Sequence, residues 1–431
     1  MLQAVRNAFN IPDLRRKLMF TFLILAIYRL AAHVPVPNVD PVALRQFFER
    51  SHLLRFLDMF SGGAMSNFSV MALGVYPYIT ASIIIQLLMP LFPQLEALAE
   101  EGDAGRQKIS QYTHYLAIPL AMLQGFGQAT ILQRQGVITQ FGLAPATLLP
   151  TLSTLATLTA GTMFAIWLGE LIDRDGIGNG ISIIIFGGIV SRVPQRMGQM
   201  LVTDVGGLIM FLIIMVITVA VIVFVQEGER RVPVQYGKRV VGMRGRQLQV
   251  RGGQSTHIPL KVNSAGMIPL IFAQSIMIFP GVIASYLRLS SVGWVSQTAD
   301  GIYRLFNSKG NFYWIMYFLM VVGFTYFYTD VMFQQQNLSE NLRRQGGFIP
   351  GIRPGRRTSS YLNGILQRIT LVGAVFLGGV AILPGLVRGV SETSTMLITS
   401  SGLIIVVGVV LDTMRSLEAQ LLMRRYEGFI R

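Results

Sequence analysis

Long runs without charged residues alternate with short charged segments along this chain, and they predict ten membrane-spanning helices. A helix needs about 20 mostly apolar residues to cross the hydrocarbon core of a bilayer, and all but the first of the runs approach or exceed that length. The first run continues past Arg29, whose long side chain can reach the membrane surface. The uncharged runs cover residues 18–28, 59–95, 109–133, 135–169, 176–191, 205–226, 262–287, 310–329, 369–387 and 393–411.

The run 59–95 is too long for one span and too short for two. Its first half, around residues 61–67, is small and polar, whereas its second half, from Tyr76 to Met89, is apolar. This division predicts a short re-entrant helix at about residues 54–68, followed by the second span.

The distribution of basic residues orients the ten spans. An even number of spans places both termini on one side, and 25 of the 36 Lys and Arg residues then fall on that side. Because cytoplasmic loops carry an excess of Lys and Arg, we expect both termini in the cytoplasm. The two most basic cytoplasmic loops cover residues 227–262 and 334–366.

An internal repeat divides the spans into two sets of five. Five identities recur at an offset of 192 residues, and they lie at the starts of the second and the seventh span. An odd number of spans per half inverts the second half, as in many transport proteins. We therefore expect halves at 1–203 and 204–431, with a pathway between them. The paired residues are Gly74 and Gly266, Pro77 and Pro269, Ile79 and Ile271, Ala81 and Ala273, and Ile84 and Ile276.

Composition agrees with a membrane protein and excludes several kinds of site. Hydrophobic residues make up 52% of the chain and charged residues 13%, against roughly 25% charged in soluble domains. The mean hydropathy is +0.53. With no cysteine, the chain has no disulfide, iron–sulfur cluster or thiolate metal site. Its four histidines are scattered, so we expect neither a metal nor a cofactor.

Nothing in the sequence indicates catalysis, and we expect no enzyme. The carboxylates Glu170, Asp330 and Asp412 fall at span ends, where water is within reach. The glycine-rich stretch 176–180 follows a helical run rather than a strand, so it predicts a tight loop and not a nucleotide site. A secondary transporter of a small solute stays open as the alternative function, because unwound backbone inside a membrane can bind ions.

The basic loops carry more charge than membrane anchoring requires. Loop 227–262 holds eight basic residues against two acidic ones, and its alternating stretch 230–241 predicts a hairpin strand. Anchoring remains one interpretation. The other is docking of a large acidic partner, such as ribosomal RNA or an acidic motor protein. The candidate docking residues are Arg230, Arg231, Lys238, Arg239, Arg244, Arg246, Arg353, Arg356 and Arg357.

Motifs along the whole chain resemble the SecY family, the channel-forming subunits of the bacterial Sec protein translocon. Each motif is weak alone, and their common order and spacing make the resemblance specific. The matching stretches lie at residues 59–64, 72–74, 77–88, 108–112, 161–164, 167–170, 176–186, 254–263 and 348–355.

The resemblance implies an all-α polytopic protein with ten transmembrane helices, in two pseudo-symmetric inverted five-helix halves around a central pore, with a re-entrant plug helix. It also implies translocation of unfolded secretory proteins across the bacterial cytoplasmic membrane, and lateral release of membrane-protein helices. The implied partners are the SecE and SecG subunits, the SecA ATPase, the ribosome, the signal sequences of client proteins and membrane lipid.

The family motifs also assign the site residues. A ring of aliphatic side chains would seal the pore, and the pairs 75/79 and 181/185 each lie on one helix face. The alternative is that these residues only pack between helices. For the sixth position, Ile404 is a competing candidate to Ile405. The pore ring comprises Val75, Ile79, Ile181, Ile185, Ile271 and Ile405; the plug hinge is Gly62 and Gly63; the lateral gate comprises Ile83, Gln86, Leu87, Gln274, Met277 and Phe279.

Overall fold

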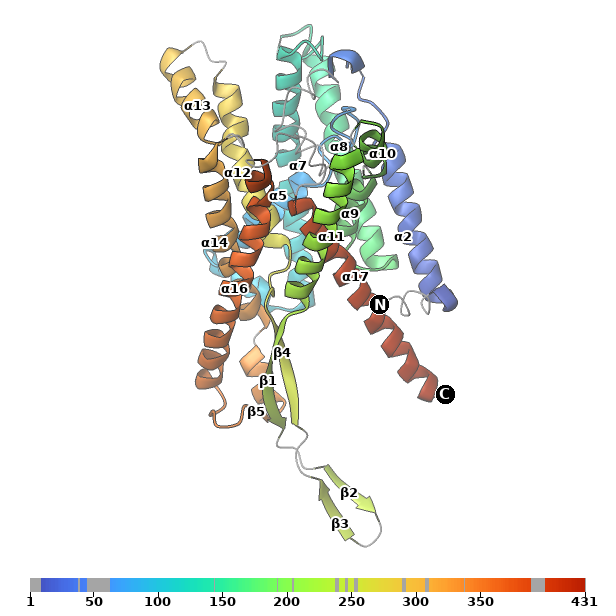
Figure 1. Cartoon of the computed structure of the whole chain (residues 1–431), viewed down its shortest axis with the longest axis vertical. Coiled ribbons are helices and arrows are strands. Elements are labelled where there is room, and N and C mark those ends of the chain that lie inside the picture. Colours follow the sequence, from blue (N-terminus) through green and yellow to red (C-terminus); the bar gives the residue numbers. More distant parts are fainter. Residues whose placement is uncertain are drawn as a thin grey trace. The chain divides into compact units, whose positions relative to one another are not determined.

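The chain folds mainly into helices, with strands confined to two segments between them (Figure 1). The structure is a computed structural model that describes residues 9–37, 39–44, 63–142, 144–191, 193–203, 205–236, 240–244, 247–251, 255–288, 292–306, 310–336, 338–388 and 400–430. Its helices are α2 (Pro12–Ala31), α5 (Tyr76–Leu88), α6 (Pro93–Glu100), α7 (Asp103–Arg134), α8 (Leu148–Asp175), α9 (Gly180–Ser191), α10 (Val193–Thr203), α11 (Val205–Glu227), α12 (Ile268–Leu287), α13 (Gly293–Leu305), α14 (Asn311–Gln336), α15 (Leu338–Arg344), α16 (Arg356–Arg388) and α17 (Ser400–Ile430).

The chain divides into two compact units. The first contains residues 1–213, 278–310 and 393–431, and the second contains residues 214–277 and 311–392. The first unit includes the helices from α2 to α10, α13 and α17. The second includes α14, α15, α16 and the sheet described below.

Several helices are long and apolar enough to cross a membrane. Among the described residues four qualify, Ala104–Arg134, Leu148–Asp175, Asn311–Arg344 and Arg356–Leu383. A fifth span results if α5 and α6 are counted together, although the chain bends by 106° between them. The protein is therefore a multi-pass membrane protein.

The two repeat segments adopt the same backbone conformation. Gly74 and Gly266 have φ angles of 54° and 66°, in a region that glycine enters without steric cost. Each lies two residues before a helix, and each helix has proline at its second position, where a missing N–H costs nothing. The N–H of Ile79 donates to the carbonyl of Val75, and that of Ile271 donates to Met267, its counterpart. The repeat found in the sequence is thus also a repeat in local structure.

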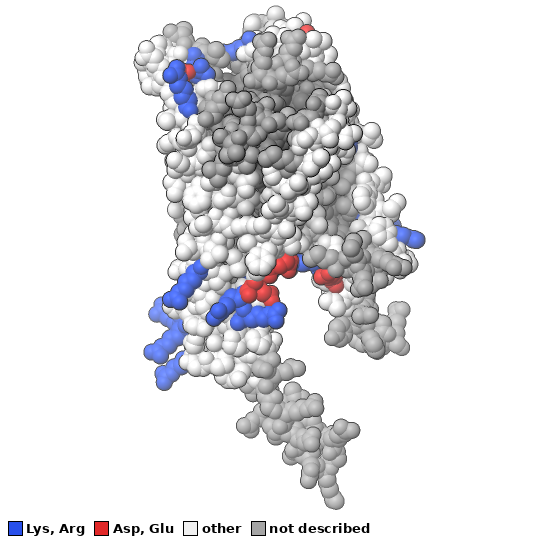
Figure 2. All heavy atoms as spheres, viewed as in Figure 1, with Lys and Arg blue, Asp and Glu red and all other residues white. Residues whose placement is uncertain are grey.

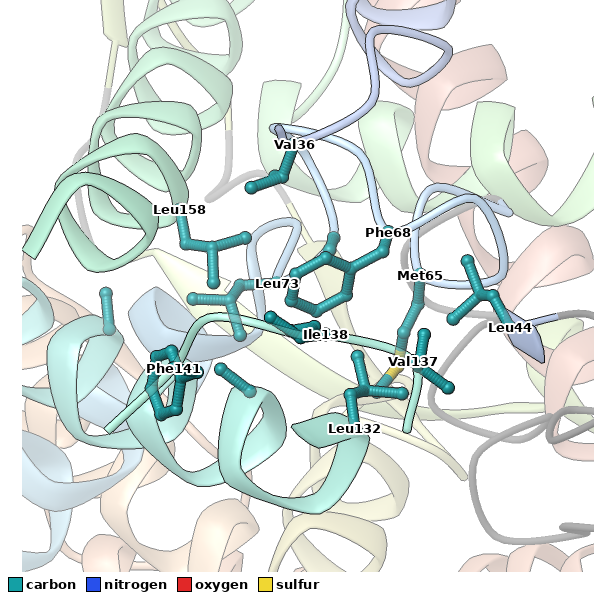
Figure 3. Packing of buried hydrophobic residues seen from close by; sticks show 13 residues of the cluster. Val36, Leu44, Met65, Phe68, Leu73, Leu132, Val137, Ile138, Phe141 and Leu158 are labelled. Atoms are coloured by element: carbon teal, nitrogen blue, oxygen red, sulfur yellow. The ribbon is translucent and has the colours of Figure 1, made fainter. Parts of the chain in front are cut away.

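A buried cluster anchors the segment before α5 (Figure 3). Phe68 and Met65 pack with Leu73, Leu132 and Leu158, among other apolar side chains of the first unit. The backbone there runs through successive turns, with Ser69 N–H donating to the carbonyl of Ala64 at 2.8 Å. The expected plug helix at about 54–68 is therefore wrong for its last part, because residues 63–68 form turns. Residues 54–62 lie outside the described residues.

A three-stranded antiparallel sheet joins two loops in the second unit. Strand β1 (Glu229–Tyr236) pairs along its length with β4 (Ser255–Lys261), and its last two residues pair with β5 (Gly347–Phe348). A separate hairpin consists of β2 (Val240–Arg244) and β3 (Gln247–Arg251). The strand predicted from the alternating stretch is confirmed, since Val232 and Val234 are buried and their neighbours are exposed.

Replacing Phe68 by alanine should destabilise the first unit more than the same change at an exposed phenylalanine. Phe68 is fully buried, and removing such a side chain costs about 3–5 kcal/mol of folding free energy. The control is Phe92→Ala, because Phe92 is 53% exposed. Thermal unfolding of the two variants in detergent tests this. Equal unfolding midpoints for the two variants would show that the buried cluster does not anchor this segment.

Candidate functional site

Four of the six proposed pore-ring residues lie on α5 and α9 or beside them, in the first unit. Val75 and Ile79 are buried at the start of α5. On α9, Ile185 is buried and Ile181 is half-buried. Burial of this kind fits a closed aliphatic constriction and also ordinary helix packing.

The position of α9 is set by an unusually close contact with α8. A side chain added at Gly180 would place its Cβ 1.9 Å from the carbonyl oxygen of Gly169, so only glycine allows this approach. The N–H of Gly180 donates to Asp173 Oδ1 at 2.7 Å. The Cδ1 atom of Ile181 would lie 2.8 Å from a Cβ at Gly169, so this ring residue packs against α8.

The other two proposed ring residues are both buried. Ile271 lies near the start of α12 and belongs to the second unit. Ile405 lies on α17 in the first unit and is fully buried, as is Ile404. Solvent exposure therefore does not decide whether Ile404 or Ile405 is the sixth residue of the proposed ring.

The proposed gate residues on α5 form a partly polar strip. Ile83 is buried, and Leu87 is half-buried. Gln86 donates from Nε2 to Ser82 Oγ at 3.2 Å, one turn earlier on the same helix. Its Oε1 atom has no hydrogen-bond partner among the described residues.

The proposed gate residues on α12 are more deeply buried. Gln274 and Met277 are almost inaccessible to solvent. Gln274 lies next to the hydroxyl of Tyr317 on α14, but its Oε1 atom lacks a partner of good geometry within the described part of the chain. An unsatisfied buried polar atom costs about 1–3 kcal/mol, so this strip is packed less favourably than an apolar one. The side chain of Phe279 lies outside the described residues.

The structure describes one of the two residues of the proposed plug hinge. Gly63 has a φ angle of 94°, which an L side chain adopts only with strain. Gly62 lies outside the described residues.

The proposed docking residues gather around the three-stranded sheet. Arg230 and Arg231 are exposed on β1, and Arg353, Arg356 and Arg357 are exposed just after β5. Figure 2 shows basic side chains at the end of the second unit where Figure 1 labels β5 and α16. The side chain of Arg244 on β2, and all of Lys238, Arg239 and Arg246, lie outside the described residues.

The loop that carries Arg353 is held by its neighbours. Gly351 and Gly355 have φ angles of 80° and 109°, and Thr358 Oγ1 donates to the carbonyl of Arg353 at 3.1 Å. Ile352 packs against a core shared by the sheet, α15 and α16. The Arg353 side chain is thus exposed on a fixed support.

Charge pairing separates the arginines of this loop into two groups. Glu340 pairs with Arg343 and Arg344, at 3.0 and 3.5 Å. No ion pair involves Arg353, Arg356 or Arg357 within the residues that the structure describes. These three cations are therefore available to an external acidic group.

The sequence did not single out a polar contact beside Ile79. The ring centroid of Tyr78 lies 5.4 Å from that of His114 on α7, and His114 Nε2 lies 3.2 Å from Glu170 Oε1 on α8. This contact joins three helices of the first unit. Within the described residues, no group of three or more His, Asp or Glu could hold a metal ion.

Known proteins resemble this chain over its whole length. The family model for SecY matches residues 69–414. The protein translocase subunit SecY of Thermotoga maritima is 42% identical over 446 residues, which cover all of this chain and 98% of that protein.

Solved structures share the fold. A structure described as a protein conducting channel aligns with a TM-score of 0.62 at 15% identity, covering 96% of each chain. Sec61 in a canine ribosome–channel complex from the endoplasmic reticulum aligns with a TM-score of 0.59 at 15% identity, again covering 96% of each chain. From the sequence relationship over the full length, this chain belongs to the SecY family.

Proposed function

We propose that this protein forms a channel that conducts unfolded secretory proteins across the bacterial cytoplasmic membrane and releases the helices of membrane proteins sideways into the lipid. The observation that carries the proposal is the 42% identity to a protein translocase subunit along the entire chain. No observation favours the small-solute transporter. The proposed arrangement has ten spans, with both termini in the cytoplasm and halves at 1–203 and 204–431.

A pore for unfolded chains needs a seal that fits clients of every sequence. Branched aliphatic side chains provide one, because a narrow apolar constriction excludes water and ions without binding them. The buried residues Val75, Ile79, Ile185, Ile271 and Ile405, with the half-buried Ile181, supply the side chains for the ring. Support comes from the repeat, in which Ile79 and Ile271 occupy equivalent positions of equivalent helix starts.

The plug and the lateral gate control the two exits of the channel, one across the membrane and one sideways into the lipid. The plug segment, hinged at Gly62 and Gly63, closes the pore from outside. A seam between α5 and α12 opens to the lipid, and the poorly satisfied polar atoms of Gln86 and Gln274 support a seam that separates at low cost.

The basic sheet receives the partners that drive transport. Sec61 was solved as part of a ribosome–channel complex, and we extend ribosome binding to this chain. SecA binds the same cytoplasmic surface, and SecE and SecG complete the channel. The guanidinium groups of Arg353, Arg356 and Arg357, which form no ion pair with the described part of the chain, support this role. A fixed guanidinium makes two-pronged contacts with carboxylates and phosphates.

Replacing Ile79 and Ile271 together by asparagine should make the resting channel leak. Two amides hydrate the constriction, so ion current across a planar bilayer should rise, and precursors with defective signal sequences should pass more easily. The control replaces Ile84 and Ile276 by asparagine, since they are a second equivalent pair of the same repeat and both are half-buried. Equal currents from the two double variants, at matched channel content, would remove Ile79 and Ile271 from the ring.

Replacing Arg353 by glutamate should abolish SecA-driven translocation while the channel still inserts. Arg353→Lys should retain part of the activity, because lysine keeps the charge but loses the two-pronged geometry. The control is Arg344→Glu, since Arg344 lies in the same loop and is already paired with Glu340. The measurement is protection of a precursor from protease in vesicles, with SecA binding measured in parallel. Normal translocation by Arg353→Glu would indicate that this loop serves only to anchor the protein at the membrane.

A further inference from the structure

Helix α13 has two faces of opposite character. At 100° per residue, Trp294, Val295, Ile302 and Leu305 fall on one side of the helix, and the polar residues around Asp300 fall on the other. Such a division is typical of a helix that lies along a boundary between an apolar and an aqueous phase.

The apolar face of α13 is exposed. Trp294 is 71% exposed, Leu305 48% and Ile302 41%, and Ala299 is the one buried residue of the helix. Leu287 and Val292, just before the helix, are also exposed. This surface continues the apolar character of the end of α12.

The polar face of α13 is held by ion pairs, and together with Arg288, the residue that follows α12, it carries one net positive charge. Arg288 Nε and Arg304 Nη2 both lie 2.8 Å from carboxylate oxygens of Asp300. The Arg288 guanidinium also lies 4.4 Å from the centre of the Tyr303 ring. Two arginines therefore share one carboxylate, and Arg304 keeps 80% of its side chain exposed. Figure 2 shows basic groups around an acidic one where Figure 1 labels α13.

The chain keeps α13 close to the membrane. The candidate span that includes α14 begins at Asn311, only six residues after Leu305, which limits their separation to about 20 Å. Ser296 Oγ donates to the carbonyl of Arg288 at 2.8 Å, and together with the Arg288–Asp300 pair it ties α13 to the residue that follows α12. The helix is thus tethered to apolar segments at both ends.

We propose that α13 lies in the interface of the bilayer and binds anionic phospholipid. Trp294, Ile302 and Leu305 enter the boundary between headgroups and acyl chains, where tryptophan is enriched. The guanidinium groups of Arg304 and Arg288 contact lipid phosphates. The net positive charge of the cluster selects anionic headgroups over zwitterionic ones. The proposal does not depend on what passes through the channel.

Fluorescence of Trp294 tests the apolar half of the proposal. Replacing Trp167 and Trp314 by phenylalanine leaves Trp294 as the single tryptophan of the full chain. In vesicles of phosphatidylcholine brominated near the headgroup, Trp294 should be quenched and its emission should be blue-shifted. A variant that keeps only Trp167, half exposed on the candidate span α8, is the control for correct insertion. Quenching of Trp167 with no quenching of Trp294 would overturn the proposal, because Trp294 would then face water or another protein and not lipid.

Selective bromination tests the charged half. In mixed vesicles where only phosphatidylglycerol is brominated, quenching of Trp294 should indicate about fivefold enrichment of that lipid over its bulk fraction. Arg304→Gln should return the quenching to the bulk value, while the Arg288–Asp300 pair preserves the fold. The matched control is Arg134→Gln, an exposed arginine at the end of α7. No enrichment, or equal loss in both variants, would overturn binding of anionic lipid at α13.

Discussion

The absence of hydrogen-bond partners in the hydrocarbon core constrains this chain more than any other factor. Backbone N–H and C=O groups in that layer must be satisfied within the protein, which favours helices. The stretch 63–75 departs from helix and is tolerated because it is buried in protein. Its backbone groups bond within its own turns and to residues 34 and 36, and Phe68 and Met71 are fully buried. The helix start that carries Val75 and Ile79 is therefore fixed by packing upstream of it.

Much of the fold follows from local patterns in the sequence. Uncharged runs predict helices such as α5, which begins and ends within one residue of the apolar stretch from Tyr76 to Met89. Alternation predicts β1 because every second residue faces a core. The repeated glycines predict two equivalent helix starts because few residues other than glycine accept a positive φ angle.

The rest of the fold depends on contacts between distant segments, which local patterns do not contain. Nothing in the dipeptide Gly347–Phe348 identifies it as the third strand of a sheet, since its partner lies in another loop. The contact of His114 with Glu170 joins two helices in the same way. The proposed ring residues pose a different difficulty, because an isoleucine that seals a pore and an isoleucine that only packs between helices have the same side chain. Burial does not separate Ile404 from Ile405 either, since both are fully buried.

The pairing of β1 with β5 has a consequence for the order of events during synthesis. Tyr236 pairs with Gly347, which follows it by 111 residues. At the rate at which a ribosome extends a chain, about 5–20 residues per second, β1 waits several seconds or more for its partner. Helices α12 and α14 are made in that interval. The basic surface is thus complete only after these apolar helices have been made, so a half-made chain lacks part of this surface.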